Sequence, residues 1–121
     1  NVLDGRNLAL LSLAGVMAVE KGYKRLAVGF HHEPIARPFP DASPEFLDAV
    51  NNVFKQSFIA DLKVIAPFKN WTREQIFSFS SQVDSAILQD AHTCYEDVAG
   101  GCGSCSHCLT KTEILAEMNR Y

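Results

Sequence analysis

Apolar residues in the first third of the chain follow a helical period and then give way to a strand-like run. Residues 5 to 21 predict a helix that Asp4 can cap and that Gly22 ends. The large apolar side chains of this segment lie on different sides of the predicted helix: Leu8, Leu11, Val16 and Val19. Such a helix needs burial nearly all round.

Two short apolar runs, residues 25 to 31 and residues 62 to 66, read as buried strands, the second ended by Pro67. Between them, Ser43 followed by Pro44 marks the start of a second helix. One apolar stripe runs along that helix: Phe46, Leu47, Val50, Val53, Phe54 and Phe58. A strand, a helix and a strand in this order predict a right-handed parallel crossover unit.

Helices outnumber strands in the rest of the chain. Thr72 and Gln75 form a capping box for a third helix, and a last helix is expected from Ser106 onward. The class is therefore α/β, with a partial Rossmann-like parallel sheet and more helix than strand. Parallel sheets normally carry several strands and are covered on both faces, so part of this sheet is expected to lie outside the chain.

All four cysteines of the chain fall between residues 93 and 108. A small disulfide-stapled protein spreads its cysteines along the chain, so a pair of disulfides is a weak interpretation here. Cys102, Cys105 and Cys108 form overlapping C-x2-C pairs, and Cys94 lies far enough upstream for a loop to bring in a fourth sulfur. Nearby glycines suit a loop that wraps an ion: Gly100, Gly101 and Gly103.

Four thiolates saturate a tetrahedral zinc ion and leave no position for substrate, so this site is expected to be structural. An iron–sulfur cluster also takes four thiolates and stays an alternative, although ligand type and spacing favour zinc. His107 lies between two of the ligands and is a further alternative ligand.

Length and composition set the remaining bounds. With 121 residues and 47% hydrophobic content, the chain has the size of one globular domain. A net charge of −3 without a basic cluster gives no attraction to nucleic acid or to anionic membranes. No apolar run has transmembrane length, and no leader sequence is evident. Thiolates reserved for a metal suggest a reducing cytoplasm.

Four segments, in this order, resemble the second half of the 7-cyano-7-deazaguanine synthase family. They are GRNLALLSLAGVMAVEKGYKRLAVGF, FPDASPEFLDAV, APFKNWTREQI and TCYEDVAGGCGSCSHC. The family belongs to the ATP pyrophosphatase superfamily and to queuosine synthesis. The resemblance implies that residues 1–90 are the C-terminal part of an ATP-pyrophosphatase-like α/β domain and that residues 91–121 are a zinc-binding segment with a terminal helix.

The resemblance also implies an activity, an ATP-dependent ligation. The carboxylate of 7-carboxy-7-deazaguanine is adenylated, ammonia gives an amide, and a second activation yields the nitrile. The four cysteines match the structural zinc ligands of the family. Gly5, Arg6 and Asn7 match its GRN motif at the nucleotide and substrate cleft, whereas Phe39, Pro40 and Asp41 align with a YPD motif that shapes the substrate pocket. Family members are generally homodimers.

The chain departs from the family at the substrate loop and at the phosphate-binding loop. Ala42 and Ser43 stand where the family has a cysteine and an arginine, and Arg37 from the same loop is the candidate replacement for the lost guanidinium. The SGGxDS phosphate-binding loop does not occur, and its place would be upstream of Asn1. The chain alone is therefore expected not to hydrolyse ATP.

Two functions from different classes follow. In the first, the chain is the substrate-and-zinc half of a nitrile-forming ligase, or of a relative acting on another carboxylate, and works with a separate nucleotide-binding half. In the second, it is a non-catalytic zinc module that mediates protein association. Arg6, Asn7 and Asp41 facing one cleft would favour the first.

Overall fold

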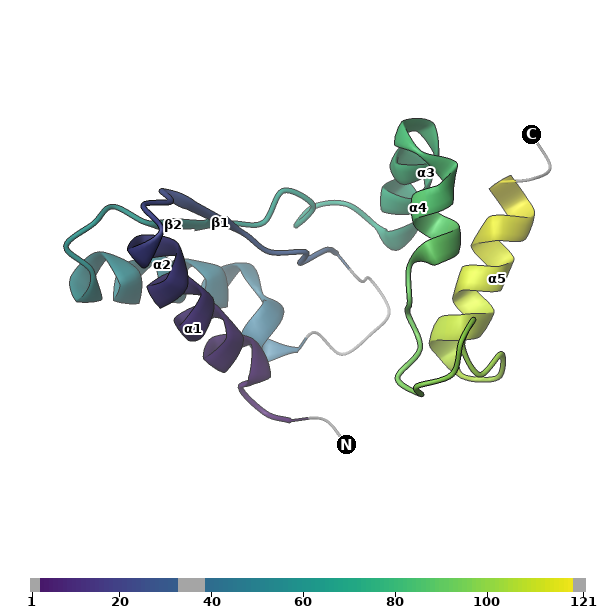
Figure 1. Cartoon of the computed structure of the whole chain (residues 1–121), viewed down its shortest axis with the longest axis horizontal. Helices are drawn as coiled ribbons and strands as arrows, with labels where there is room; N and C mark the ends of the chain where they lie inside the picture. The colour runs from purple at the N-terminus through teal and green to yellow at the C-terminus, as the bar shows by residue number, and fades with distance from the viewer. Residues whose placement is uncertain (1–2, 33–38, 119–121) are drawn as a thin grey trace. The chain divides into compact units, whose positions relative to one another are not determined.

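The computed structural model describes residues 3–32 and 39–118. The chain divides into two compact units, residues 1–72 and residues 73–121. The first contains two strands with helices α1 and α2, and the second contains helices α3, α4 and α5 (Figure 1). The boundary at residue 90 that the family resemblance implies lies inside the second unit.

Helix α1 spans Arg6–Glu20, close to the predicted range, but its start differs from the prediction. Gly5 is the N-cap residue, with φ 72°, and no side chain from this position caps the helix, so the assignment of that role to Asp4 is wrong. The left-handed Gly5 turns the chain before the first helical residue. The carboxylate of Asp41, from the same unit, caps the helix instead.

The end of α1 follows the prediction. Gly22 has φ 73°, its N–H donates to the carbonyl of Val19 at 3.0 Å, and the N–H of Tyr23 donates to that of Ala18 at 2.8 Å. This pair of bonds is a Schellman motif, which satisfies the last helical carbonyls. Only one side of α1 is buried, through Leu11, Gly15 and Ala18.

The predicted parallel sheet is present and shorter than the sequence suggested. Strand β1 spans Arg25–Ala27 and strand β2 spans Lys63–Ile65, with Leu26 opposite Val64. The N–H of Val28 makes one more ladder bond, 2.9 Å to Ile65. Pro67 then has no N–H with which to continue the ladder.

Helix α2 spans Pro44–Ser57 and follows a short 3-10 turn, η1, at Pro40–Ala42. The predicted cap is confirmed, because the Ser43 hydroxyl accepts a hydrogen bond from the N–H of Phe46 at 3.1 Å. Proline at the first helical position adds to this start, since its ring fixes the backbone as a helix requires.

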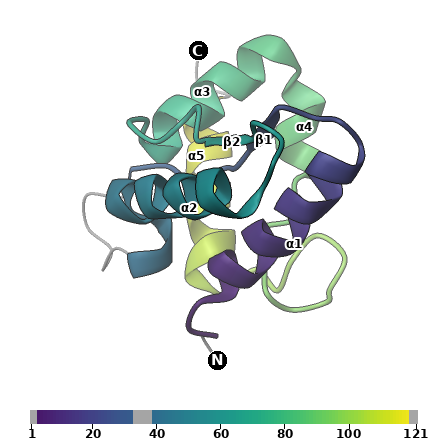
Figure 2. The same ribbon diagram turned by 90° about the vertical axis from the view of Figure 1, so that its left-hand side faces the viewer.

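The core lies on one side of the sheet, where α1 and α2 both pack (Figures 1 and 2). Its buried members come from both helices and from the second strand region: Leu11, Ala18, Leu47, Val50, Phe54, Leu62, Val64 and Ala66. Alternate strand residues face the other way, and of these Arg25, Ala27 and Lys63 are exposed. One face of the sheet is therefore covered by helices of this unit.

Gly15 on α1 lies directly against the ring of Phe54 on α2. A Cβ atom added to Gly15 would lie 2.6 Å from Cζ of Phe54, well inside van der Waals contact. Phe54 is only 4% exposed, and its ring also packs against Phe58 with centroids 5.0 Å apart. The ring therefore has little room to move, and the small residue sets the distance between the two helices.

The second unit is built from α3 (Arg73–Val83), α4 (Ser85–Asp90) and α5 (Ser106–Met118). Helix α3 begins directly after Thr72, and α5 begins at Ser106, both as predicted. Helix α4 was not predicted, because it has only six residues. Asp84 caps it by accepting a hydrogen bond from the N–H of Ala86 at 2.9 Å.

The close approach at Gly15 makes a testable prediction for stability. Gly15→Ala should destabilise the chain by about 1–2 kcal/mol, because overpacking against Phe54 outweighs the gain of about 1 kcal/mol in helix propensity. Urea unfolding followed by circular dichroism measures this. Ser12→Ala on the exposed side of the same helix is the control, with a change within about 0.5 kcal/mol. A Gly15→Ala variant as stable as the parent would show that the ring yields.

Candidate functional site

The four cysteines come together in the second unit. Their sulfur atoms all lie within 4.8 Å of one another, and Cys94 and Cys108 are buried. The Sγ atoms of Cys94 and Cys105 are 3.9 Å apart. Four sulfurs at about 2.3 Å from a tetrahedral zinc ion would be about 3.8 Å apart, whereas a disulfide needs about 2 Å. The geometry fits a metal site and no disulfide pairs.

Backbone N–H groups surround the sulfurs. The N–H groups of Glu96 and Cys102 donate to Sγ of Cys94 at 3.3 and 3.4 Å. The N–H of Cys105 donates to Sγ of Cys102 at 3.4 Å, and that of Cys108 donates to Sγ of Cys105 at 3.5 Å. Because these donors favour the charged form of a thiol, they prepare the cluster to present thiolates to a cation.

Two of the thiols differ in acidity. Hydrogen bonds from the backbone of Ser104, and then of Cys105, lower the pKa of Cys102 to about 6 and so favour its thiolate form. The backbone of Gly103 lowers the pKa of Cys108, but the neighbouring cysteine sulfurs and burial outweigh it and raise that pKa to about 11. Such a site releases protons when it takes up a metal ion.

The loop between the first and second cysteine depends on glycine. Gly100 and Gly101 have φ values of 80° and 87°, in the region that other residues rarely adopt. Gly101 is under a second constraint, because an added Cβ would lie 2.8 Å from Sγ of Cys108. Nothing lies within 4 Å of the corresponding position at Gly100. Gly101 thus lets the loop pass directly beside a ligand.

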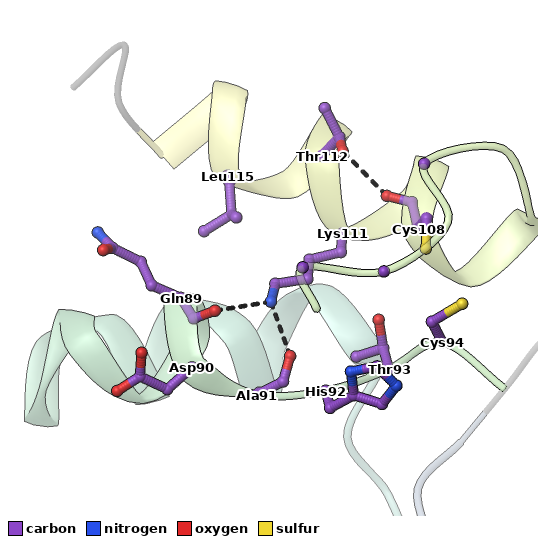
Figure 3. Close-up of a pocket in the computed structure, with 13 residues that line it drawn as sticks. Gln89, Asp90, Ala91, His92, Thr93, Cys94, Cys108, Lys111, Thr112 and Leu115 are labelled. Atoms are coloured by element: carbon purple, nitrogen blue, oxygen red, sulfur yellow. Dashed lines mark hydrogen bonds between the residues drawn. The ribbon is translucent and has the colours of Figure 1, made fainter. Parts of the chain in front are cut away.

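Lys111 on α5 holds the segment that leads to the first cysteine, a role that no sequence signal indicated. Its Nζ donates to the carbonyls of Gln89 at 2.9 Å and Ala91 at 2.7 Å, at the C-terminal end of α4 (Figure 3). A cation is favourable at that end of a helix. These residues, together with Cys94 and Cys108, line a cavity of about 510 Å³.

The histidine alternative has little support from the geometry. In the described part of the chain, the group that can hold a metal consists of the four cysteines. His107 instead packs edge to face against Tyr95, with ring centroids 5.2 Å apart. The ring of His92 lies near the Glu96 carbonyl, at 3.2 Å. These aromatic and backbone contacts occupy both histidines of the loop.

The GRN and FPD segments meet in the first unit. The backbone N–H of Asn7 donates to a carboxylate oxygen of Asp41 at 3.0 Å, and the Asn7 side-chain amide donates to the Asp41 carbonyl, also at 3.0 Å. The Asp41 carboxylate thereby caps the N-terminus of α1, where negative charge is stabilised. Two segments separated by 34 residues are thus joined through their polar residues.

The other predicted residues of this region lie around that pair. Gly5, Arg6, Phe39 and Pro40 are exposed, while Asn7 and Asp41 are half-buried. Ser43, at the position of the family arginine, donates its hydroxyl to the Pro40 carbonyl at 2.9 Å and caps α2. Arg37, the candidate replacement for that arginine, lies outside the described residues.

Fold and cysteine cluster together define an α/β protein with a four-cysteine metal-binding loop. The family model of queuosine biosynthesis protein QueC matches residues 1–119. The chain therefore belongs to the QueC family, as its motifs suggested.

Three relatives illustrate the match. The 7-cyano-7-deazaguanine synthase of Methanosarcina mazei is 32% identical over 113 residues, which cover 93% of this chain and 48% of the relative. Synthases of Colwellia psychrerythraea and of a Marinomonas species are each 29% identical, over 98% of this chain and 53% of the relative. The chain thus spans about half the length of the curated relatives it matches.

The two loop glycines give a matched test of the metal site. Gly100→Ala and Gly101→Ala both place a side chain at positive φ, at a cost of about 1–2 kcal/mol. Only Gly101→Ala also pushes against Sγ of Cys108, so it should weaken zinc binding about tenfold more than Gly100→Ala. Competition with a chromophoric chelator measures both affinities. Equal losses in the two variants would contradict the close approach at Gly101.

Proposed function

We propose that this chain is the substrate-and-zinc half of an ATP-dependent ligase that converts 7-carboxy-7-deazaguanine to 7-cyano-7-deazaguanine. The contact between Asn7 and Asp41 carries the proposal, because it joins the two motifs that the family resemblance assigns to one pocket. Family membership supports the same reaction, since the matched relatives are named for the nitrile product.

In this proposal the pair of Asn7 and Asp41 shapes the pocket. Its two hydrogen bonds fix the 3-10 turn η1 against the start of α1, which holds the exposed Arg6 and Phe39 beside a rigid junction. Arg6 supplies a fixed positive charge for a carboxylate or phosphate, and Phe39 offers an aromatic face to a purine-like ring. The Asp41 carboxylate is already engaged by α1, so its role is to position these groups.

ATP binding is assigned to a different polypeptide segment. The chain has no SGGxDS sequence to cradle phosphates. We therefore assign nucleotide binding and activation of the carboxylate to the half of the relatives that the match does not cover. The part represented here contributes the substrate pocket and the metal-binding loop.

Zinc is the proposed occupant of the cysteine cluster. Four sulfur ligands and the absence of a histidine from the described cluster suit zinc, and the saturated ligand set makes the role structural. Thiolate ligands of this kind persist in a reducing compartment, which places the protein in the cytoplasm in this proposal. None of the helices in the described part of the chain has the length and apolar content that crossing a membrane requires.

A homodimer is the proposed assembly. Leu10, Leu13 and Met17 form an apolar stripe along the outer side of α1, and they are 57%, 67% and 60% exposed. Soluble monomers rarely leave such stripes in water, and a two-fold contact between identical patches is the commonest way to cover one. The same stripe is the observation that favours the second candidate function, a non-catalytic zinc module that mediates association.

The catalytic proposal predicts a requirement for both halves. Alone, the chain should form no nitrile from ATP, ammonia and 7-carboxy-7-deazaguanine, whereas the chain joined to the uncovered part of the Methanosarcina mazei relative should form it. In the joined enzyme, Asp41→Ala should lower kcat/KM about 10- to 100-fold, because it removes a charged hydrogen bond of about 1.5–3 kcal/mol.

Asp48→Ala is the control for that loss, since Asp48 is exposed on α2 and should leave kcat/KM nearly unchanged. Liquid chromatography of the nitrile product gives the rates. Nitrile formation by the isolated chain would refute the assignment of ATP binding to the part of the relatives that the match does not cover. An Asp41→Ala enzyme of full activity would refute the role of the junction.

The assembly makes a separate prediction. At tens of micromolar the chain should be a dimer by light scattering, and Leu13→Asp should make it a monomer, because a charge in the centre of the apolar stripe costs several kcal/mol on burial. Ser12→Asp, next to it on another side of the helix, should remain a dimer. A monomeric parent chain, or a dimer that survives Leu13→Asp, would show that α1 does not form the interface.

A further inference from the structure

The four cysteines of the cluster differ in their access to solvent. Cys94 and Cys108 are buried, whereas Cys102 and Cys105 are half-buried. Both residues between the half-buried pair are exposed, so this turn forms the outer side of the cluster. A small oxidant that arrives from solvent therefore meets Cys102 and Cys105 first.

The two half-buried sulfurs also differ in the hydrogen-bond donors around them. Sγ of Cys102 accepts hydrogen bonds from the N–H of Cys105 at 3.4 Å and from the Ser104 hydroxyl at 3.6 Å. In the described part of the chain, Sγ of Cys105 accepts from a single backbone group, the N–H of Cys108 at 3.5 Å. Such donors stabilise negative charge on a sulfur and lower its nucleophilicity. Cys105 is therefore the more nucleophilic thiolate of the two.

A second sulfur lies close to that of Cys105. The Sγ atoms of Cys94 and Cys105 are 3.9 Å apart, and a disulfide between them requires about 2 Å. The segment that follows Cys94, residues 95–100, is exposed along its whole length. Because few neighbours restrain that segment, it can adjust while the two sulfurs approach each other.

Cys108 is held more firmly than Cys94. It lies in the first turn of α5, and its carbonyl accepts a hydrogen bond from the Thr112 hydroxyl at 3.0 Å. Gly101 packs against its sulfur, since a Cβ atom added to that glycine would lie 2.8 Å from Sγ. A helix and a loop backbone thus restrain Cys108 from two sides, and Cys94 is the favoured partner for Cys105.

We propose that the cysteine cluster is a peroxide-sensitive switch, in which Cys105 and Cys94 form a disulfide and the loop releases its metal ion. The proposal rests on the proposed function in one respect, the zinc ion assigned to the four cysteines. It goes beyond that function by assigning a modification site to the pair and hydrogen peroxide as its oxidant.

The oxidation follows from ordinary thiolate chemistry. The thiolate of Cys105 attacks one oxygen of hydrogen peroxide, the O–O bond breaks, and a sulfenic acid and a hydroxide ion form. The thiolate of Cys94 then attacks the sulfenic sulfur, the S–O bond breaks, and a second hydroxide ion leaves as the disulfide forms. The electron pair that the two thiolates lose together reduces one peroxide to two hydroxide ions. A dithiol reductant reverses the change.

The disulfide removes half of the ligand set. Cys102 and Cys108 alone cannot saturate a tetrahedral zinc ion, so the affinity of the loop for zinc falls steeply. Cys108 is the ligand that α5 contributes from its first turn, and it no longer ties that helix to the loop through the metal. Oxidation is therefore expected to loosen α5.

Peroxide titration of the zinc-loaded chain tests the switch. In the presence of a chromophoric chelator that binds zinc more weakly than the intact site, one equivalent of peroxide should release about one zinc ion per chain. Mass spectrometry after alkylation should then find Cys94 linked to Cys105, with Cys102 and Cys108 still free. Dithiothreitol followed by zinc should restore all four thiols and the metal content.

Two histidine variants provide matched controls, because histidine keeps a fourth zinc ligand in the site. Cys105→His removes the attacking sulfur and should slow zinc release by peroxide at least about tenfold. Cys102→His leaves the reacting pair intact and should release zinc at nearly the parent rate. Zinc content before the addition of peroxide shows that each variant is loaded, and the disulfide mapped in the parent chain does not depend on either variant.

A disulfide between any other pair, conversion of the cysteines to sulfinic acids, or equal rates in the two histidine variants would each overturn the proposal. Retention of zinc with four intact thiolates in excess peroxide would refute the switch and leave the proposed metal site standing. A chain that takes up no zinc and still forms the disulfide between Cys94 and Cys105 would refute the assigned metal and support the modification site.

Discussion

The sulfur cluster is the constraint on which the second unit depends. Among its described residues, the buried apolar ones are Leu88, Ile114 and two of the cysteines themselves, Cys94 and Cys108. A core of that size cannot hold three helices together, whereas a structural zinc site can contribute on the order of 10 kcal/mol. Lys111 lies one helical turn after the last cysteine of the cluster. Its hydrogen bonds to two backbone carbonyls add to the stability of the unit by holding the C-terminal end of α4. The loop is therefore arranged around the four sulfurs, which lie close enough together to hold a metal ion.

In the first unit, two side chains make hydrogen bonds to backbone groups that a local cap or a neighbouring strand would otherwise pair with. Asp41 caps α1 in place of a local residue, and Asn51 bonds β2 as a neighbouring strand would. Each of these contacts joins segments that are distant in sequence, and each satisfies backbone groups that would otherwise be unpaired. One junction joins the GRN and FPD segments of the proposed substrate site, and the other occupies backbone groups at the outer edge of β2.

Sequence patterns predicted the elements whose signals are local. The Ser43–Pro44 start of α2, the parallel pair β1 and β2, and the four-cysteine cluster are confirmed, because periodicity, caps and ligand spacing act over a few residues. The Asp4 cap was wrong, since the competing carboxylate of Asp41 is 34 residues away from the N–H it binds. Asn51 could have been noticed as a polar residue inside the apolar stripe of α2, but nothing in the sequence says which backbone it meets.

In the proposed metal site, four thiolates bind one zinc ion and hold the loop. X-ray absorption at the zinc edge of the purified chain, together with elemental analysis, tests this. About one zinc per chain with four sulfur ligands at about 2.3 Å is expected. Iron with inorganic sulfide, a nitrogen ligand in place of one sulfur, or a fully folded chain without metal would contradict it.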